Sequence, residues 1–271
     1  MSKISQFISY KKNNIDVKVN SKINEIWVNH FIEKYCEDNK DELNSGETIY
    51  YIRNQLVKVF DPILEKNIVI KKFNLEKKYD RIRFRFLASK AERSLKIARS
   101  LMRVGLKTPE PLAVIEKRGK TNEIIFSYYI TEYIDYDFNM LKIAEELNHP
   151  KRNEFKELLP QLAKEIKKMH KENIIHNDLH AGNILVKNIN NKPTFYYVDL
   201  NRGRVKKRLS EKEKINDLKR FNFTEEEKKI FFKNYSPDNW IHYKDKVSKA
   251  RKKREKFVRT KNKIREFFGI K

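Results

Sequence analysis

The segment IIHNDLHAGNILVKN, residues 174–188, concentrates side chains that could do chemistry just before an apolar stretch. His176, Asp178 and Asn183 follow the spacing H-x-D-x-x-x-x-N, and Asp199 comes at the end of a later predicted strand. In phosphoryl transfer, one carboxylate accepts the proton of the attacking hydroxyl, and a second carboxylate and an amide oxygen hold Mg²⁺ against the phosphates. These residue types fit that chemistry, and we expect Asp178, Asn183 and Asp199 to meet in one ion-filled cleft.

The same loop allows two simpler interpretations. Asp178 and Asn183 could form an ordinary turn through Asx hydrogen bonds. His176 and His180 flank Asp178 and could belong to a zinc site, but the sequence shows no further zinc signature around them. Because Asp199 follows a strand pair at the right place, we favour the phosphoryl-transfer interpretation, with a structural role for His176.

The net charge is strongly positive and points to a polyanionic partner. The 271 residues contain 61 Lys and Arg against 37 Asp and Glu, which gives +24. Cys36 is the single cysteine, so no disulfide can form within the chain. The first residues lack the apolar core of a secretory signal, and no apolar run approaches the roughly 18 residues of a membrane-spanning helix. We expect a cytoplasmic protein, or one bound to a membrane from its cytoplasmic side.

Apolar periodicity predicts strands in the first half of the chain and helices in the second. Strands are expected at 48–60, 67–73, 111–116, 123–134, 184–186 and 194–200, and helices at 89–104, 137–148, 152–172 and over most of 208–268. Gly105 is expected to close the first helix. The pattern predicts an α+β fold with two lobes. Residues 1–134 are expected to form a small antiparallel sheet with one helix, and residues 135–271 a mainly helical lobe.

Several stretches together resemble the protein-kinase-like superfamily and, more narrowly, the lipopolysaccharide kinase family, whose members phosphorylate sugars of the inner core. In chain order these stretches are IVIKKFN, SKAERSLKIARSL, GLKTPEPLAVIE, HNDLHAGNIL and VDLNRGR. They span about half the chain, roughly residues 67–205. The resemblance implies a two-lobed protein-kinase-like fold that uses ATP and Mg²⁺. HNDLHAGNIL alone is also similar to the corresponding loop of aminoglycoside and choline phosphotransferases.

The resemblance also implies roles for the residues of the loop. Asp178 would be the catalytic base, and Asn183 and Asp199 would be the magnesium ligands. His176 would support the loop through hydrogen bonds.

Nucleotide binding would fall to residues of the first lobe. Lys71, in a strand of the V-A-I-K type, would bind the α- and β-phosphates, and Glu92 would hold that lysine. The lobe connection Thr131–Tyr133, which includes Glu132, would meet the adenine through its backbone.

Two of these roles have local alternatives. Ser89 and Glu92 have the spacing of a helix capping box, which explains Glu92 without any kinase. Lys72 competes with Lys71 but points to the opposite face of the strand. Lys71 shares its face with Val69, a candidate adenine contact, and we therefore favour it.

The sequence departs from the superfamily pattern at two places. It has no G-x-G-x-x-G, because Gly46 is the single glycine before Gly105, so the phosphate-covering turn, placed near Arg53–Gln55, would work without glycine. The usual D-F-G is replaced by Asp199-Leu200-Asn201, which keeps the carboxylate. These departures favour a small-molecule kinase over a protein kinase.

The segment 243–271 carries 13 Lys and Arg against 3 Asp and Glu, which contributes +10 of the +24. Five of its apolar residues fall on a narrow helical stripe: Val247, Ala250, Phe257, Ile264 and Phe268. Such a stripe beside cations suits an anionic lipid surface, although it could also pack on the second lobe. Nucleic-acid binding is the less favoured interpretation of this segment, because interleaved aromatic residues are sparse there.

These observations predict an ATP-dependent kinase that phosphorylates a sugar hydroxyl, on 3-deoxy-manno-octulosonic acid (Kdo) or heptose, in a lipid A–core glycolipid. The basic segment 243–271 would hold the enzyme at the inner face of the cytoplasmic membrane. Three alternatives remain. They are a soluble kinase of the aminoglycoside and choline type, a kinase-shaped binding module that has lost nucleotide binding, and a basic RNA-binding protein whose affinity falls steeply with salt.

Overall fold

The computed structural model describes residues 5–36, 43, 46–51, 54–75, 78–146, 148–189 and 192–267. The chain divides into two compact units. The first unit consists of Met1–Asp135 and Val198–Arg202, and the second consists of Tyr136–Tyr197 and Gly203–Lys271. The division falls one residue after the expected boundary at residue 134, but the short segment that contains Asp199 returns to the first unit.

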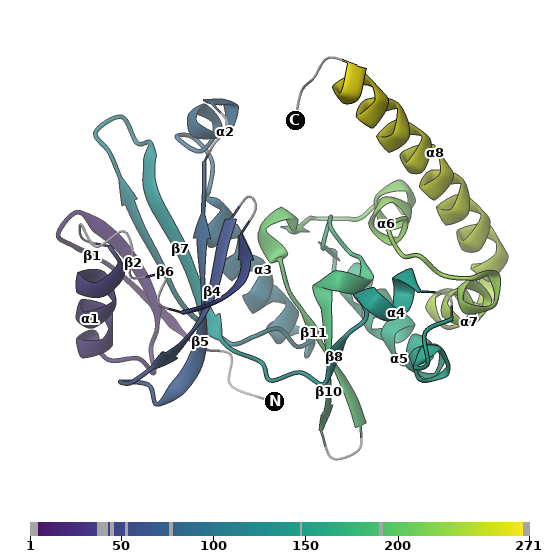
Figure 1. The fold of residues 1–271 in the computed structure, drawn as a ribbon, viewed down its shortest axis with the longest axis horizontal. Coiled ribbons are helices and arrows are strands. Elements are labelled where there is room, and N and C mark those ends of the chain that lie inside the picture. The colour runs from purple at the N-terminus through teal and green to yellow at the C-terminus, as the bar shows by residue number, and fades with distance from the viewer. Residues whose placement is uncertain are drawn as a thin grey trace. The chain divides into compact units, whose positions relative to one another are not determined.

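The first unit is built on a seven-stranded antiparallel sheet in the order β1-β2-β6-β7-β5-β4-β3 (Figure 1). Its strands are β1 (Phe7–Lys12), β2 (Ile15–Asn20), β3 (Glu47–Tyr51), β4 (Asn54–Asp61), β5 (Lys66–Phe73), β6 (Pro111–Arg118) and β7 (Ile124–Glu132). The predicted strand 48–60 is therefore two strands, β3 and β4. Of the predicted phosphate-covering turn, Arg53 lies outside the described residues, and Asn54 and Gln55 already belong to β4.

Helices cover both faces of this sheet. Alternation along β5 sends Ile68 and Ile70 into one core with Trp27 and Phe31 of α1 (Glu25–Tyr35). On the other face, Phe73 joins a second cluster with residues of α3 (Lys90–Arg103). The prediction of a single helix in this lobe is wrong, since α1 and the short α2 (Lys78–Arg83) accompany α3.

Helix α3 starts and stops where its sequence indicates. The Ser89 side chain accepts a hydrogen bond from the N–H of Glu92 at 3.0 Å, which caps the first turn. At the other end Gly105 has a φ of 74°, a left-handed conformation that suits glycine. Its N–H donates to Met102 O, and the N–H of Leu106 donates to Leu101 O, so the last carbonyls of the helix are satisfied.

The second unit is mainly helical. Its helices are α4 (Leu141–Glu145), α5 (Arg152–Lys171), α6 (Glu211–Leu218), α7 (Glu225–Tyr235) and α8 (Trp240–Phe267), with 3₁₀ turns η2 (Ala181–Asn183) and η4 (Pro237–Asn239). Its strands are β8 (Phe138–Asn139), β9 (Ile174–Ile175), β10 (Ile184–Ile189), β11 (Lys192–Tyr197) and β12 (Arg204–Val205). Helices α5 and α7 pack together, with Phe155, Leu159 and Phe231 fully buried. Pro160 lies inside α5 without ending it.

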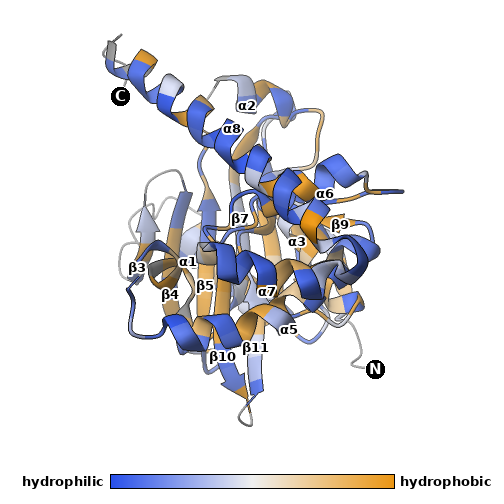
Figure 2. Ribbon diagram, turned by 90° about the vertical axis from the view of Figure 1, so that its right-hand side faces the viewer, coloured by the Kyte–Doolittle hydropathy of each residue, from blue (hydrophilic) through white to orange (hydrophobic). Residues whose placement is uncertain are grey.

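One predicted helix of this unit is shortened, and the region 208–268 is mostly helical as predicted. The predicted helix 137–148 begins as strand β8 and becomes helical as α4. The basic C-terminal region contains three helices, of which α8 is the longest and is mostly hydrophilic with short apolar bands (Figure 2). Within the described part of the chain, we find no helix with the length and apolar character needed to cross a bilayer.

Candidate active site

Lys71 and Lys72 project from opposite faces of β5. Lys71 forms an ion pair with Asp199, and its side chain is only 11% exposed. The Lys72 ammonium instead lies 5.8 Å from the ring centroid of Tyr128, a residue of the core that contains α1. The alternation of the strand thus separates the two lysines, and Lys71 is the one brought to a residue of the predicted site.

Asp199 stands in a constrained turn. Its φ of 57° is left-handed, which is uncommon for a residue other than glycine. The side-chain N–H of Asn201 donates to Asp199 Oδ1 at 2.5 Å. The following 3₁₀ turn η3 (Leu200–Arg202) packs against α3. Asn201, where the D-F-G pattern has glycine, therefore helps to hold the carboxylate that Lys71 contacts.

Glu92 does not contact Lys71. Its carboxylate forms an ion pair with Lys18 of β2, and the capping interaction at Ser89 uses its backbone N–H. Lys71 meanwhile uses Asp199 as its partner. The hairpin β1–β2 extends the sheet beyond β6, and its residue Lys18 supplies the cation that pairs with Glu92 of α3.

The predicted lobe connection already uses two of its backbone donors. The N–H of Glu132 donates to Glu110 O, and the N–H of Tyr133 donates to Asn67 O, both at 2.9 Å. The Glu132 carboxylate pairs with Lys66 at 2.5 Å. These two N–H groups are therefore committed within the first unit, and the adenine role of Glu132 and Tyr133 stays a prediction.

The loop between β9 and β10 holds the other predicted residues. His176, Asp178 and Asn183 are all buried. Asp178 donates its backbone N–H to His176 Nδ1 at 3.3 Å, and the Asn183 side-chain N–H donates to Asp178 O at 2.9 Å. The His180 ring accepts the N–H of Gly182 at 3.1 Å and caps η2. Both histidine rings thus accept hydrogen bonds from backbone N–H groups of the loop.

Asp217 of α6 fixes this loop, and sequence reasoning missed it. Its carboxylate accepts the backbone N–H of His176 at 3.0 Å and that of Asn177 at 2.6 Å. Asn177 has a φ of 63°, so the loop is held in a left-handed turn at this point. In the sequence, the only indication that Asp217 is buried is that it lies between two apolar residues, Ile215 and Leu218. Both are buried in the structure.

A histidine and a tyrosine complete the support of Asp217. His170 Nε2 lies 3.2 Å from Asp217 Oδ2, and His170 Nδ1 lies 2.7 Å from the Tyr235 hydroxyl. Burial raises the pKa of Tyr235, with smaller contributions from Tyr243 and Asp217, so its hydroxyl stays protonated and can donate to Nδ1. This assigns the Nε2 proton of His170 to the bond with Asp217.

Arg220 contacts the predicted base directly. It follows α6 and forms an ion pair with Asp178, whose side chain is 9% exposed. Burial lowers the pKa of Arg220, and the nearby charge of Arg254 lowers it further. Asp178 therefore lies in a loop whose backbone is fixed by Asp217, and its carboxylate pairs with the Arg220 guanidinium of the same unit.

Asn183 and Asp199 each carry the hard oxygen donors that Mg²⁺ prefers. Because Asn183 gives its amide N–H to Asp178 O, its side-chain oxygen is left for a cation. Asp199 supplies a carboxylate. Asn183 belongs to the second unit and Asp199 to the first, and their joint role as metal ligands stays a prediction. In the described residues, His, Cys, Asp and Glu side chains form no group of three suited to a metal ion.

The first prediction compares the two lysines of β5. Lys71→Met should weaken Mg-ATP binding by about tenfold or more, because the phosphates lose a charge-assisted contact. Lys72→Met should bind as the wild type does, since Lys72 lies on the face that contains Tyr128. The measurement is the rise in melting temperature on adding Mg-ATP to each variant. An equal rise in both variants would contradict the assignment of Lys71.

Comparisons with known proteins show which family and fold the chain is similar to. The model of the lipopolysaccharide kinase (Kdo/WaaP) family matches residues 65–243. A 3-deoxy-D-manno-octulosonic acid kinase from Haemophilus influenzae (strain 86-028NP) is 26% identical over 147 residues, which are 53% of this chain and 59% of that protein. The solved structure of WaaP in complex with acyl carrier protein matches 81% of this chain and 95% of that chain, with a TM-score of 0.56 and 15% identity.

The structural match defines the class: the chain has the α+β fold of two-lobed kinase-like proteins, as predicted. The family match covers both the strand that carries Lys71 and the loop that carries Asp178. The chain belongs to the lipopolysaccharide kinase (Kdo/WaaP) family. The match to the Haemophilus kinase spans less than two thirds of that protein's length.

Proposed function

We propose that this protein transfers the γ-phosphate of ATP to a hydroxyl of Kdo or heptose in the lipopolysaccharide inner core. The observation that carries the proposal is the ion pair between Lys71 and Asp199, which lie 128 positions apart in the chain. It joins the predicted phosphate-binding lysine to the predicted metal carboxylate. The family match and the similarity to a Kdo kinase supply the acceptor class.

In this proposal Asp178 accepts the proton of the acceptor hydroxyl. The hydroxyl oxygen forms the new bond to the γ-phosphorus, and ADP leaves with the electrons of the bond that breaks. Asp217 keeps the loop in place through the N–H groups of His176 and Asn177. Lys71 neutralises charge on the phosphates, and bound Mg²⁺, held by Asn183 and Asp199, would supply further positive charge there.

Mass spectrometry of the host's lipopolysaccharide tests this function. Core oligosaccharide from cells that make the protein should carry one more phosphate on an inner-core sugar than core from cells that lack it. Restoring the wild-type chain should restore that phosphate, and restoring Asp178→Asn should not. Identical cores with and without the protein would contradict the proposal.

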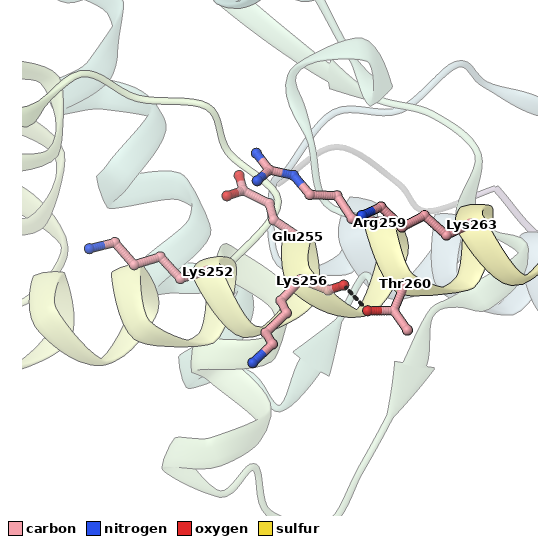
Figure 3. Close-up of a pocket in the computed structure, with 6 residues that line it drawn as sticks. All are labelled: Lys252, Glu255, Lys256, Arg259, Thr260 and Lys263. Atoms are coloured by element: carbon pink, nitrogen blue, oxygen red, sulfur yellow. Dashed lines mark hydrogen bonds between the residues drawn. The ribbon is translucent and has the colours of Figure 1, made fainter.

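We also propose that the C-terminal half of α8, which contains Phe257 and Ile264, contacts an anionic membrane surface on the cytoplasmic side. Phe257 and Ile264 are 67% and 52% exposed, and their spacing of seven places them on one side of the helix. Nearby side chains are mostly basic, and Figure 3 shows six that line a shallow hollow along this one helix: Lys252, Glu255, Lys256, Arg259, Thr260 and Lys263. Phe268, which was also placed on this stripe, lies outside the described residues.

Vesicle binding tests this contact. Phe257→Asp combined with Ile264→Asp should weaken binding to vesicles rich in anionic lipid by about tenfold or more, because two apolar side chains no longer enter the interface. Ile8→Asp combined with Ile125→Asp is a matched control, since these residues of β1 and β7 are 53% and 58% exposed. Equal binding of the two double variants in a sedimentation assay would contradict the membrane role.

A further inference from the structure

Arg220, which pairs with Asp178, forms a cluster with two further cations of the second unit, Lys219 and Arg254. Lys219 caps the C-terminal end of α6, and Arg220 follows it and pairs with Asp178. Arg254 comes from α8, which packs against α6. The charge of Arg254 is close enough to lower the pKa of both Lys219 and Arg220, in each case after burial as the larger cause.

Arg251 fixes α8 over this cluster. Its Nη1 donates to Phe221 O at 2.7 Å and to Arg220 O at 3.3 Å, and its Nη2 donates to Asn222 Oδ1 at 3.0 Å. Arg251 therefore holds the backbone of the residue that pairs with Asp178. Arg254 lies three positions later and so extends from the same side of the helix. The helix thus positions Arg254 next to the segment that starts at Lys219.

The cluster carries more positive charge than its neighbours neutralise. Lys219 donates to the neutral side chain of Asn216 at 2.9 Å. Glu255, the acid next to Arg254 in sequence, pairs with Arg251 at 2.8 Å. In the part of the chain that the structure describes, Arg254 makes no hydrogen bond or ion pair, although its side chain is partly buried. Asp178 is the carboxylate that contacts the cluster, so two of the three cations lack an acidic partner there.

We propose that Lys219, Arg220 and Arg254 form an anion subsite that binds an acidic group of the acceptor sugar beside Asp178. Guanidinium groups suit this task, because their planar donors match carboxylate and phosphate oxygens. Binding of the acid gives Arg220 a second anionic partner and loosens its hold on Asp178, whose carboxylate can then take the hydroxyl proton. The inference rests on the proposed function and adds that the acceptor is recognised as an anion.

Steady-state kinetics with acidic and neutral acceptors tests the subsite. Arg254→Gln should raise the KM for a Kdo-containing lipid A acceptor by about tenfold or more, with little change in kcat or in the KM for ATP. Lys253→Gln is the matched control, because it removes one charge from an exposed neighbouring position of the same helix. Equal KM values in the two variants would overturn the subsite.

Two modified acceptors identify the source of the anion. If the Kdo carboxylate binds there, converting it to a carboxamide should remove the difference between Arg254→Gln and wild type. If a lipid A phosphate binds there, a dephosphorylated acceptor should remove it. Either result supports the subsite. A difference that persists with both acceptors lacking their anions would show that Arg254 acts on something other than an acidic group, and would overturn the proposal.

A binding measurement separates this inference from the proposed function. If the wild type transfers no phosphate to any acceptor, the proposed function fails, but titration calorimetry with two ligand pairs still reports on the subsite: Kdo against its carboxamide, and lipid A against its dephosphorylated form. Wild type and Lys253→Gln should prefer the anionic member of at least one pair, and Arg254→Gln should lose that preference. Equal affinity of the wild type for both members of each pair would overturn the subsite on its own.

Discussion

Replacing Asp178 by Asn is expected to lower kcat for phosphate transfer to the sugar by about 10²–10⁴-fold. The amide has nearly the shape of the carboxylate but cannot accept the hydroxyl proton. The loop should survive the change, because Asn183 bonds to the backbone oxygen of Asp178 and Asp217 holds the preceding N–H groups. The KM for ATP should change little, since Lys71 is untouched.

Glu172→Gln is a suitable control for this variant. Glu172 is an exposed acid at the end of α5, six positions before Asp178 in the chain. Circular dichroism of both variants checks that they fold, because Asp178→Asn also removes the anionic partner of Arg220. A kcat for Asp178→Asn equal to that of Glu172→Gln would remove Asp178 from the role of base.

The second large effect concerns stability. Arg152→Met should lower the free energy of unfolding by about 3–5 kcal/mol, because it leaves the carboxylate of Glu227 buried without its cation. Arg152 joins α5 to α7 through two parallel bonds to Glu227, of 2.7 and 2.8 Å. Glu227 is fully buried, and Arg152 is only 7% exposed. Urea unfolding followed by circular dichroism measures the change.

The same two helices provide the control. Lys156 of α5 pairs with Glu226 of α7 at 2.6 Å, but these side chains are 28% and 63% exposed. Lys156→Met should therefore cost at most about 1 kcal/mol. Adding Glu227→Met to Arg152→Met should recover part of the lost stability, because no unpaired charge then remains buried. Equal losses in Arg152→Met and Lys156→Met would show that burial does not decide the strength of these pairs.

The sequence predicted the elements whose signals are local. Helix α3 has a capping serine, apolar residues at helical spacing and Gly105 at its end, and it forms as expected. The hairpin β1–β2 also has a local sequence signal, the pair Asn13-Asn14 at its turn. Asn13 and Asn14 adopt φ values of 48° and 62°, the left-handed pair that a two-residue hairpin turn requires and that asparagine tolerates.

The contacts that depend on distant segments could not be predicted in this way. The pairing of Glu92 with Lys18 depends on where the hairpin joins the sheet, and no local pattern contains that information. Asp217 reaches Asn177 across 40 positions, and Arg220 reaches Asp178 from the end of the same helix. The candidate catalytic residues could be predicted from residue types at a fixed spacing, whereas the residues that support them could be identified only from the fold.

The C-terminal stripe shows the same limit within one helix. Its spacing predicted a single apolar surface, but Val247 is buried at 7% exposure while Phe257 is 67% exposed. Packing of α8 against α6 and α7 takes the first part of the stripe. Packing on the second lobe therefore holds for the first part of α8, and contact of its exposed later part with an anionic membrane stays a prediction.

Transfer of label from [γ-³²P]ATP to a purified Kdo–lipid A acceptor, in the presence of Mg²⁺, tests the central claim most directly. The account predicts label on the inner-core sugar with the wild-type chain and its loss with Asp178→Asn. If the wild type binds Mg-ATP but leaves both Kdo- and heptose-containing acceptors unlabelled, the proposed reaction is contradicted.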